Sequence, residues 1–466
     1  MGLDIIYEKT SKFSMHKFLR FDVKYWKTIK KFNKRNVINL KSLFDIYNGN
    51  SFTEYYSNEK TSIPYIRIGD LTFKYDINNE NMIYLNEEVD INEEKVLKEN
   101  DLIMATIGAT IGKINLVRQY KGGTFSNNTV LLRLKSSRYS NPFFYEKLFQ
   151  SQYFQEYIFG VVSQKSQPNL QTYDLENIKT PIISIEIQNR ILSELKPKEK
   201  NISKLRSSLI PQVNIINNVF TKYFNFDVEQ FERIKKIKQY SLSFSKFSNN
   251  KDLRQSVKFH RKSGQFIYKE LQKITDKKIK HFISEQILLG SSISPEYYDE
   301  NGDYYYVSMG DIRTWYLDKE NCKTVSNLYS TSNMNKTIQK NDIIMARSGE
   351  GTIGKVSIIE DDIIQGIFCD FTMRIRVKNC NPKFVYYYFR TDYFQYLIEI
   401  NKKGLGNNTN IFPIQLQELP MIDIPIAEQN KIVKLIETEI KKQNEIQEQI
   451  EQERKKIDLI IIKSIK

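Results

Sequence analysis

The sequence predicts an α+β protein in which two tandem modules with mixed β-sheet cores are each followed by a long α-helix. Three observations lead to this class. The chain of 466 residues exceeds one ordinary core, a series of motifs occurs twice in the same order, and short β-branched runs precede charged helical stretches in each half. We assign residues 1–184 and 229–425 to the modules, and 185–228 and 426–466 to the helices.

Internal repetition is the strongest of these signals. Residues 100–105 read NDLIMA, and residues 341–346 read NDIIMA. Further matches in the same order are YIRIGDL at 65–71 with YVSMGDI at 306–312, TIGK at 110–113 and 352–355, YFQ at 153–155 and 393–395, QNRI at 188–191 with QNKI at 429–432, Gly49 with Gly290, and the openings Arg20 and Val23-Lys24-Tyr25 with Arg254 and Val257-Lys258-Phe259. The chain is therefore predicted to be a tandem duplication.

Within each copy the strands come first. Residues 65–68, 101–106 and 129–134 are rich in β-branched and aromatic side chains and are bounded by Gly or Asn, which is typical of strands. Asn141-Pro142 and Asn381-Pro382 each place a capping side chain before a proline at the first helical position. This pattern predicts helices that run to about Phe159 and Ile400.

Each copy ends in a long charged helix, from about Ile185 to Tyr223 and from Ile426 to Lys466. A 3-4 spacing of apolar side chains predicts a coiled-coil seam, and Pro197 and Pro211 are expected to kink or interrupt the first helix. The predicted seam residues are Ile191, Leu195, Ile202, Leu205, Leu209, Val213 and Ile216 in the first helix and Val433, Ile436, Ile440, Ile450, Ile457 and Ile461 in the second, where Gln443, Gln447, Arg454 and Ser464 interrupt the pattern. The alternative is that each helix packs on its own module.

The charge balance points to an anionic partner. The chain holds 70 Lys and Arg against 55 Asp and Glu, and a net charge of +15 favours nucleic acid first and an anionic membrane surface second. A basic surface that serves only solubility is the alternative. No apolar run approaches the roughly 20 residues that span a bilayer, so we expect a soluble, cytoplasmic protein. Cys322, Cys369 and Cys380 lack the spacing of a zinc site and are expected to be reduced core thiols.

Two motifs suggest catalysis, but comparison of the copies argues against both. Residues 141–144 read NPFF, like the catalytic motif of adenine N6-methyltransferases, yet the second copy reads NPKF at 381–384 and no Gly-rich S-adenosylmethionine loop follows a strand nearby. Residues 349–355 have the spacing of a phosphate loop, but Val356 stands where a Ser or Thr would bind magnesium. We expect a glycine-rich turn between two strands instead.

Acidic clusters and histidines add no catalytic constellation. Asp90, Glu93 and Glu94 lack a counterpart in the second copy and are expected to form a solvated turn. The histidines His16, His260 and His281 have no Ser or Cys in a triad-like context. We therefore expect neither catalytic nor metal-binding residues.

In this order and twice over, the repeated motifs resemble those of the specificity subunits of type I restriction-modification systems, over nearly the full chain. The resemblance implies two target-recognition domains, each of which reads one half of a split site in double-stranded DNA. It also implies that the long helices form an antiparallel coiled coil that sets the spacer and carries two methyltransferase subunits. Those partners would bind S-adenosylmethionine and methylate adenine, restriction or translocase subunits could join them, and this chain would hold no cofactor.

A polar loop precedes each long helix, at 163–169 and 401–410, and its amides and lysines can bond base edges and phosphates. The two loops differ in sequence, as expected of modules that read different half-sites. By position and chemistry we predict DNA contacts by Arg67, Lys113, Gln164, Lys165, Gln167, Asn169, Arg347, Lys355, Lys402, Lys403, Asn407, Asn408 and Asn410. The predicted function is sequence-specific DNA reading for partner enzymes; the alternatives are a protein-interaction scaffold and an enzyme with an unrecognised site.

Overall fold

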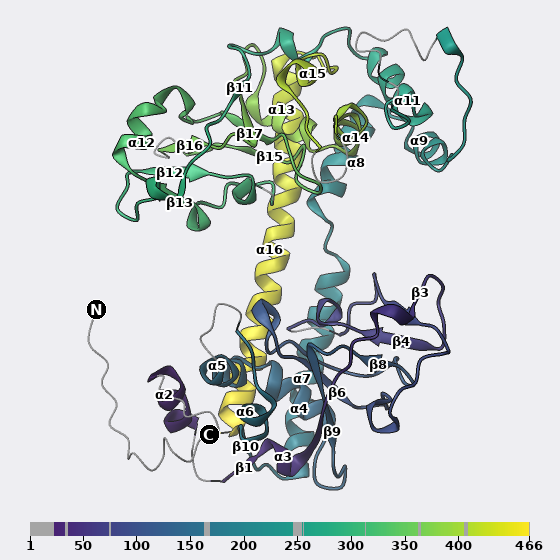
Figure 1. Ribbon diagram of the computed structural model, residues 1–466, viewed down its shortest axis with the longest axis vertical. Coiled ribbons are helices and arrows are strands. Elements are labelled where there is room, and N and C mark those ends of the chain that lie inside the picture. The colour runs from purple at the N-terminus through teal and green to yellow at the C-terminus, as the bar shows by residue number, and fades with distance from the viewer. Residues whose placement is uncertain are drawn as a thin grey trace. The chain divides into compact units, whose positions relative to one another are not determined.

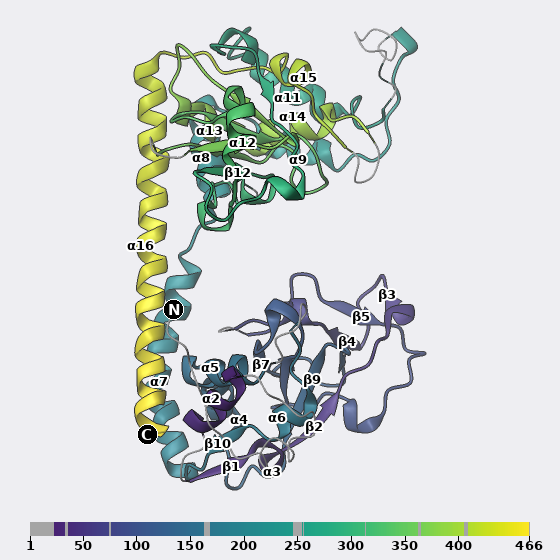
Figure 2. The ribbon, with the colours of Figure 1, turned by 60° about the vertical axis from the view of Figure 1, so that its left-hand side comes forward.

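The computed structural model describes residues 23–32, 36–73, 76–162, 168–245, 254, 256–312, 314–361, 365–404 and 409–465. The chain divides into two compact units, residues 1–208 with 447–466, and residues 209–446 (Figure 1). Helix α16 (Ile426–Ile465) begins in the second unit and ends in the first, and it is a single uninterrupted helix (Figure 2).

The first unit contains two four-stranded sheets and one two-stranded sheet. Its strands are β1 (Val37–Asn39), β2 (Phe44–Asn48), β3 (Tyr56–Ser57), β4 (Ile63–Ile66), β5 (Ile83–Leu85), β6 (Leu102–Ala105), β7 (Ile114–Leu116), β8 (Thr124–Phe125), β9 (Thr129–Leu134) and β10 (Lys179–Pro181). Its α-helices are α2 (Val23–Phe32), α3 (Leu40–Leu43), α4 (Pro142–Gln150), α5 (Gln152–Val161), α6 (Thr172–Glu176) and α7 (Ile185–Ser207). The sheet orders are β1-β10, the antiparallel β2-β9-β6-β7, and β3-β5-β4-β8, in which β4 and β8 are parallel.

The second unit repeats the two larger sheets. Its strands are β11 (Leu288–Leu289), β12 (Tyr304–Val307), β13 (Lys323–Val325), β14 (Ile343–Ala346), β15 (Val356–Ile358), β16 (Gly366–Phe368) and β17 (Thr372–Ile375). Its α-helices are α8 (Gln212–Phe224), α9 (Val228–Lys235), α11 (Lys262–Gln272), α12 (Asn327–Ser332), α13 (Pro382–Phe389), α14 (Asp392–Asn401) and α15 (Pro413–Gln417), followed by the start of α16. The order β11-β17-β14-β15 matches β2-β9-β6-β7, and β13-β12-β16, with β12 parallel to β16, matches β5-β4-β8, three of the four strands of the other sheet. The predicted α+β duplication is therefore confirmed.

The strand predictions are confirmed with small shifts. Residues 129–134 form β9 as expected, and β6 lies within the predicted 101–106. β4 begins at Ile63, and Ile68 belongs to the 3-10 helix η2 (Ile68–Asp70) rather than to the strand. The predicted match of the openings does not hold in three dimensions, because Val23 begins α2 whereas residues 257–259 form a turn before α11; Arg20 lies outside the described residues.

The two aromatic helices begin as predicted but are shorter. The side chains of Asn141 and Asn381 cap α4 and α13, with proline at the first position. The prediction of single helices to Phe159 and Ile400 is wrong, because Ser151 and Thr391 adopt extended backbone angles and split each stretch in two. Each hydroxyl donates to a carbonyl of the preceding helix and accepts from an N–H of the next, at distances of 2.5 to 3.4 Å.

The first long helix is also interrupted. α7 ends at Ser207 and α8 begins at Gln212, so the prediction of one helix from Ile185 to Tyr223 is wrong, although the break falls at the predicted Pro211. Pro211 has no N–H and restricts the residue before it, which ends a helix. Pro197 lies inside α7 without ending it.

Apolar seam positions are buried within each unit. In the first unit, Ile191 and Leu195 share a cluster with Ile461. In the second unit, α8 runs antiparallel to the start of α16, since Ile210 N donates to Gln443 Oε1 at 2.8 Å and the Tyr223 hydroxyl donates to Glu428. The other buried seam residues are Ile202, Ile216, Val433, Ile436, Ile440 and Ile450. Three more are half-buried, namely Leu205, Leu209 and Ile457. Val213 is exposed, so its assignment to the seam is wrong. A continuous coiled coil stays a prediction.

The repeated NDLIMA and NDIIMA motifs build the same buried ion pair twice. Asp101 accepts two hydrogen bonds from the Arg133 guanidinium at 2.7 and 2.9 Å, and Asp342 accepts two from Arg376 at 2.7 and 3.1 Å. Both carboxylates are about fully buried. Bidentate pairing of this kind is strong and directional. The most conspicuous sequence repeat therefore has a structural role in each unit.

The repeated glutamines join the long helices to the modules. Gln188 Oε1 accepts from the Asn141 N–H at 2.7 Å, and Gln429 Oε1 accepts from the Asn381 N–H at 2.8 Å. Each glutamine amide also donates to the backbone just before its own helix, at 2.7 and 2.9 Å. The QNRI and QNKI motifs therefore fix where each long helix leaves its module.

The repeated glycines allow two backbones to approach closely. A Cβ at Gly49 would lie 2.0 Å from the Ser126 carbonyl oxygen, and a Cβ at Gly290 would lie 2.0 Å from that of Phe368. In both units this contact joins the end of the first strand of one sheet to a strand of the other. Glycine is therefore required by the backbone contact.

We expect Gly290→Ala to lower the free energy of unfolding by about 1–3 kcal/mol, because the methyl group would collide with backbone atoms that cannot rotate away. Chemical denaturation would measure the loss. Gly310→Ala is the matched control in the same unit, since its nearest atom would be a serine side chain at 3.5 Å. Equal stability of the two variants would contradict this account.

Candidate nucleic-acid interface

Three segments meet beyond the end of β6 in the first unit, and three equivalent segments meet beyond the end of β14 in the second. In the first unit they are residues 106–109, 126–128 and 168–170, which we name loop junction 1. Thr106 N donates to Asn128 O at 3.1 Å, and Leu170 N donates to Thr106 O at 2.9 Å. The corresponding residues 347–351, 370–371 and 409–412 form loop junction 2, with Arg347 N donating to Phe371 O and Ile411 N to Arg347 O, both at 2.9 Å.

Loop junction 2 presents one oriented cation among aromatic rings. The Arg347 guanidinium donates through Nε to Asp370 O at 2.7 Å and through Nη1 to Asn410 Oδ1 at 3.2 Å, and it lies 5.8 Å from the Phe412 ring centroid. In the described part of the chain Arg347 makes no ion pair. Phe371 and Phe412 are 48% and 40% exposed. The structure thus brings together two predicted residues, Arg347 and Asn410, which lie far apart in sequence.

Loop junction 1 has the same backbone arrangement and different chemistry. Asn169 pairs with Ile107 as an isolated β-bridge, and Ser348 pairs with Asn410 in the same way in loop junction 2. None of the residues that define loop junction 1 is charged, and its polar groups are hydroxyls and amides, including the exposed Asn127. The equivalent positions of the two units therefore offer different hydrogen-bonding patterns.

Two predicted contacts of the first unit lie outside loop junction 1. Arg67 pairs with the buried Asp70 at 3.2 Å and donates to Asn81 O at 2.8 Å, so it braces η2. Lys113 Nζ lies 5.8 Å from the Phe73 ring centroid. Their roles as DNA contacts stay predictions.

Lys355 belongs to a cluster of cations and aromatic rings. Its Nζ lies 4.3 Å from the Trp315 ring centroid, and the buried Arg390 guanidinium lies 5.4 Å from the same ring. Burial, and then the Arg390 charge, lower the pKa of Lys355. Trp315 has a φ of 71°, a strained value for a bulky residue, and the Tyr386 hydroxyl donates to its carbonyl at 2.7 Å. This corner concentrates positive charge beside an aromatic surface.

Lys402 is placed differently from the exposed cation that its loop position suggests. It is buried, and its ammonium pairs with Glu399 at 2.7 Å and Glu350 at 3.2 Å. Its charge is thus offset internally. Lys403 is exposed and its backbone pairs with that of Asn410. The predicted contacts Gln164, Lys165, Gln167, Asn407 and Asn408 lie outside the described residues.

Sequence reasoning did not select Thr106, Asn127, Asn128, Phe371 and Phe412. These residues reach the loop junctions from strands and turns that are remote in sequence. The available signal was the position directly after the NDLIMA and NDIIMA motifs, where Thr106 corresponds to Arg347.

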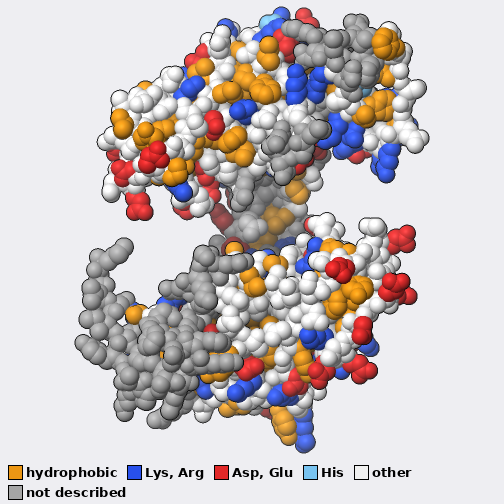
Figure 3. Space-filling model, viewed as in Figure 1, with side chains coloured by type: hydrophobic (Ala, Val, Ile, Leu, Met, Phe, Trp, Pro, Cys, Tyr) orange, Lys and Arg blue, Asp and Glu red, His pale blue; other side chains and the backbone are white. Residues whose placement is uncertain are grey.

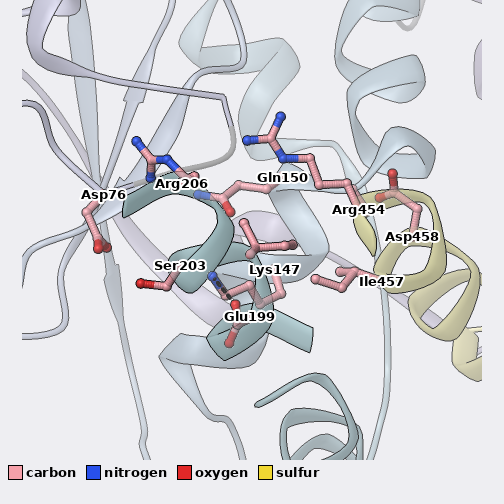
Figure 4. Close-up of a pocket in the computed structure, with 11 residues that line it drawn as sticks. Asp76, Lys147, Gln150, Glu199, Ser203, Arg206, Arg454, Ile457 and Asp458 are labelled. Carbon is pink, nitrogen blue, oxygen red and sulfur yellow. Dashed lines mark ion pairs between the residues drawn. The ribbon is translucent and has the colours of Figure 1, made fainter. Parts of the chain in front are cut away.

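The first unit also has a charged cavity of about 190 Å³, lined by α4, α7 and the end of α16 (Figure 4). Lys147 Nζ pairs with Glu199 at 2.7 Å and with the buried Glu146 at 3.5 Å. Burial by itself would raise the pKa of Glu146, but Lys147 and Arg118 together hold that pKa below its ordinary value. These charges offset one another and join α4 to α7, which is a structural role.

The two motifs that suggested catalysis make structural contacts instead. The Asn141 amide caps α4 and donates to Asn189 Oδ1 at 2.8 Å, and residues 349–355 form the expected turn between β14 and β15. His260 is buried against the Arg254 carbonyl at 2.7 Å, and His16 lies outside the described residues. Among the described residues no group of three or more His, Cys, Asp or Glu is placed to hold a metal ion.

Two further sequence expectations can be compared with the described residues. The three cysteines are free thiols, and Cys369 and Cys380 are buried. Asp90, Glu93 and Glu94 are exposed as expected, but Glu93 and Glu94 belong to the 3-10 helix η3 (Glu93–Lys95) rather than to a turn. Within the described ranges, no helix is both long enough and apolar enough to cross a membrane.

Fold and site define a class: a duplicated α+β protein in which a repeated framework presents two chemically different loop junctions. The family described as the type I restriction modification DNA specificity domain matches the chain twice, over residues 33–214 and 286–455. The chain belongs to this family. Each match covers most of one module and part of the long helix that follows it.

Several solved structures are similar over most of the chain. The S subunit of the type I restriction-modification system from M. genitalium is 14% identical, with 93% of this chain and 98% of that chain covered and a TM-score of 0.39. The HsdS subunit from Thermoanaerobacter tengcongensis is 13% identical, with 92% and 96% covered and a TM-score of 0.30. A chain from a study of assembly and conformational transition of the type I R-M system is 15% identical, with 92% and 97% covered and a TM-score of 0.46. No protein with a curated description matches significantly.

Proposed function

We propose that this chain reads a bipartite sequence in double-stranded DNA and positions partner methyltransferase subunits on it, without catalysing a reaction itself. The observation that carries the proposal is the pair of loop junctions, which share one backbone arrangement and differ in every charged group. The family membership and the net charge of +15 support it.

The chemistry of each loop junction suits a different set of base edges. An arginine guanidinium such as that of Arg347 can donate two hydrogen bonds to guanine O6 and N7. Amides such as those of Asn127 and Asn169 can bond adenine N6 and N7. Lys355 and the exposed Lys403 are suited to phosphates, which set register without carrying sequence information.

The partners would dock on the long helices. Ile426, Leu435 and Leu459 on α16 are each more than half exposed and offer apolar contacts along the helix. We infer that two methyltransferase subunits, which would hold S-adenosylmethionine, cover such positions, and that restriction or translocase subunits join the same assembly.

Genome-wide mapping of N6-methyladenine, with and without this gene, tests the proposal. We expect methylation to disappear at one split motif when the gene is removed, because the methyltransferase alone cannot select the site. Exchange of residues 1–184 for those of a related subunit should change one half of the motif only. Methylation of DNA by this purified chain alone, or a change in both half-sites, would overturn the proposal.

A further inference from the structure

The second unit carries a concentrated positive charge outside loop junction 2. Residues 228–280 contain 15 Lys and Arg against 5 Asp and Glu, which is a surplus of 10 in a chain whose net charge is +15. This segment includes α9 and α11, which pack on each other. Figure 3 shows Lys and Arg side chains gathered over the part of the unit that holds these two helices in Figure 1.

Some of these cations are neutralised by neighbouring carboxylates. Lys235 pairs with Glu232, Lys273 with Glu270, and Lys258 with Glu399. Lys278 and Lys280 share Glu418, and their hydrogen bonds lower the pKa of that carboxyl to about 2. These residues are therefore internally balanced.

The remaining exposed cations make no ion pair with any residue that the structure describes. They are Arg233, Lys236, Lys238, Arg261, Lys262, Lys269 and Lys277, which we name the α9–α11 basic surface. Lys269 lies seven positions, or about two helical turns, after Lys262, so both lie on one face of α11. Both line a groove of about 970 Å³ together with Tyr240, Phe259 and His260.

Unbalanced cations on two adjacent helices favour a polyanion with closely spaced charges. Lysine ammonium groups are flexible point charges, which suit phosphates better than base edges. A DNA duplex presents one phosphate charge for about every 1.7 Å of its axis, so it can engage several of these residues at once.

We propose that the α9–α11 basic surface binds backbone phosphates of duplex DNA outside the bases read by the loop junctions. This inference rests on the proposed DNA-reading function and adds a sequence-independent contact to it. The contact holds the chain on DNA of any sequence and raises the affinity for long duplexes over short ones.

The test compares two triple variants that lose the same charge. Lys236→Gln, Lys262→Gln and Lys269→Gln remove part of the α9–α11 basic surface. Lys319→Gln, Lys323→Gln and Lys378→Gln are the control, because these exposed lysines of the same unit also make no ion pair with described residues. Affinity for a long duplex of arbitrary sequence is measured over a range of salt concentrations, and circular dichroism verifies folding.

We expect the first variant to bind roughly 10- to 100-fold more weakly at low salt, with a log–log salt slope that is shallower by about 2–3, because each lost phosphate contact accounts for about 0.9. The control should behave like the unmodified chain, and the methylated motif in cells should stay the same for both variants. Identical salt slopes for the two variants would overturn the inference while leaving base reading intact.

Two other outcomes would also overturn it. Binding of vesicles that contain phosphatidylserine, lost in the first variant while DNA affinity is unchanged, would assign the surface to a membrane. A changed methylation motif would assign these lysines to base reading. Failure of the unmodified chain to bind duplex DNA, even with methyltransferase subunits, would overturn the proposed function itself.

Discussion

Arg347→Ala is expected to weaken recognition of one half of the proposed bipartite site by about 1–3 kcal/mol, which corresponds to roughly 5- to 150-fold, and to leave the other half unchanged. The reason is the geometry of loop junction 2, where a backbone carbonyl and the Asn410 side chain orient a guanidinium that has no ion-pair partner among the described residues. Competition binding with duplexes substituted at each position of both half-sites would measure the effect.

Two further variants sharpen this test. Arg347→Lys keeps the charge but loses the bidentate guanidinium donor. The variant should therefore keep the salt dependence of DNA binding and lose the base preference. Asn169→Ala in loop junction 1 should relax the opposite half-site. A loss that is uniform across all sequences would instead identify Arg347 as a phosphate contact.

Asp101→Ala is expected to destabilise the first unit by about 3–5 kcal/mol. The substitution removes the carboxylate that the Arg133 guanidinium contacts, and it also removes the acceptor of the Lys98 N–H at 2.7 Å. Among the described residues, the mostly buried guanidinium would then keep two backbone carbonyls and the Tyr47 ring as partners, and no carboxylate. Denaturant-induced unfolding would measure the loss.

The duplication supplies a matched comparison. Asp342→Ala should cost less, because Arg376 keeps a second carboxylate, Glu285, at 3.3 Å. The exposed Asp90→Ala should change the stability by less than about 0.5 kcal/mol. A larger effect of Asp342→Ala than of Asp101→Ala would contradict the ion-pair account.

Local patterns allowed much of the fold to be predicted from the sequence. The caps at Asn141 and Asn381, the break at Pro211 and the central strands depend on residues that are neighbours in the chain. The breaks at Ser151 and Thr391 were also local, but the aromatic run around each residue resembles one continuous helix.

The duplication, the fold class and the family resemblance were determined by the sequence alone, because a repeated order of motifs is visible without coordinates. Only the tertiary structure decided what the motifs do. In the structure, Asp101 and Gln188 make framework contacts, and Lys402 is buried beside two carboxylates. Arg347 donates a hydrogen bond to Asn410. The physical reason is that these contacts join segments that are remote in sequence, and the spacing of residues along a chain does not specify which remote segments close on one another.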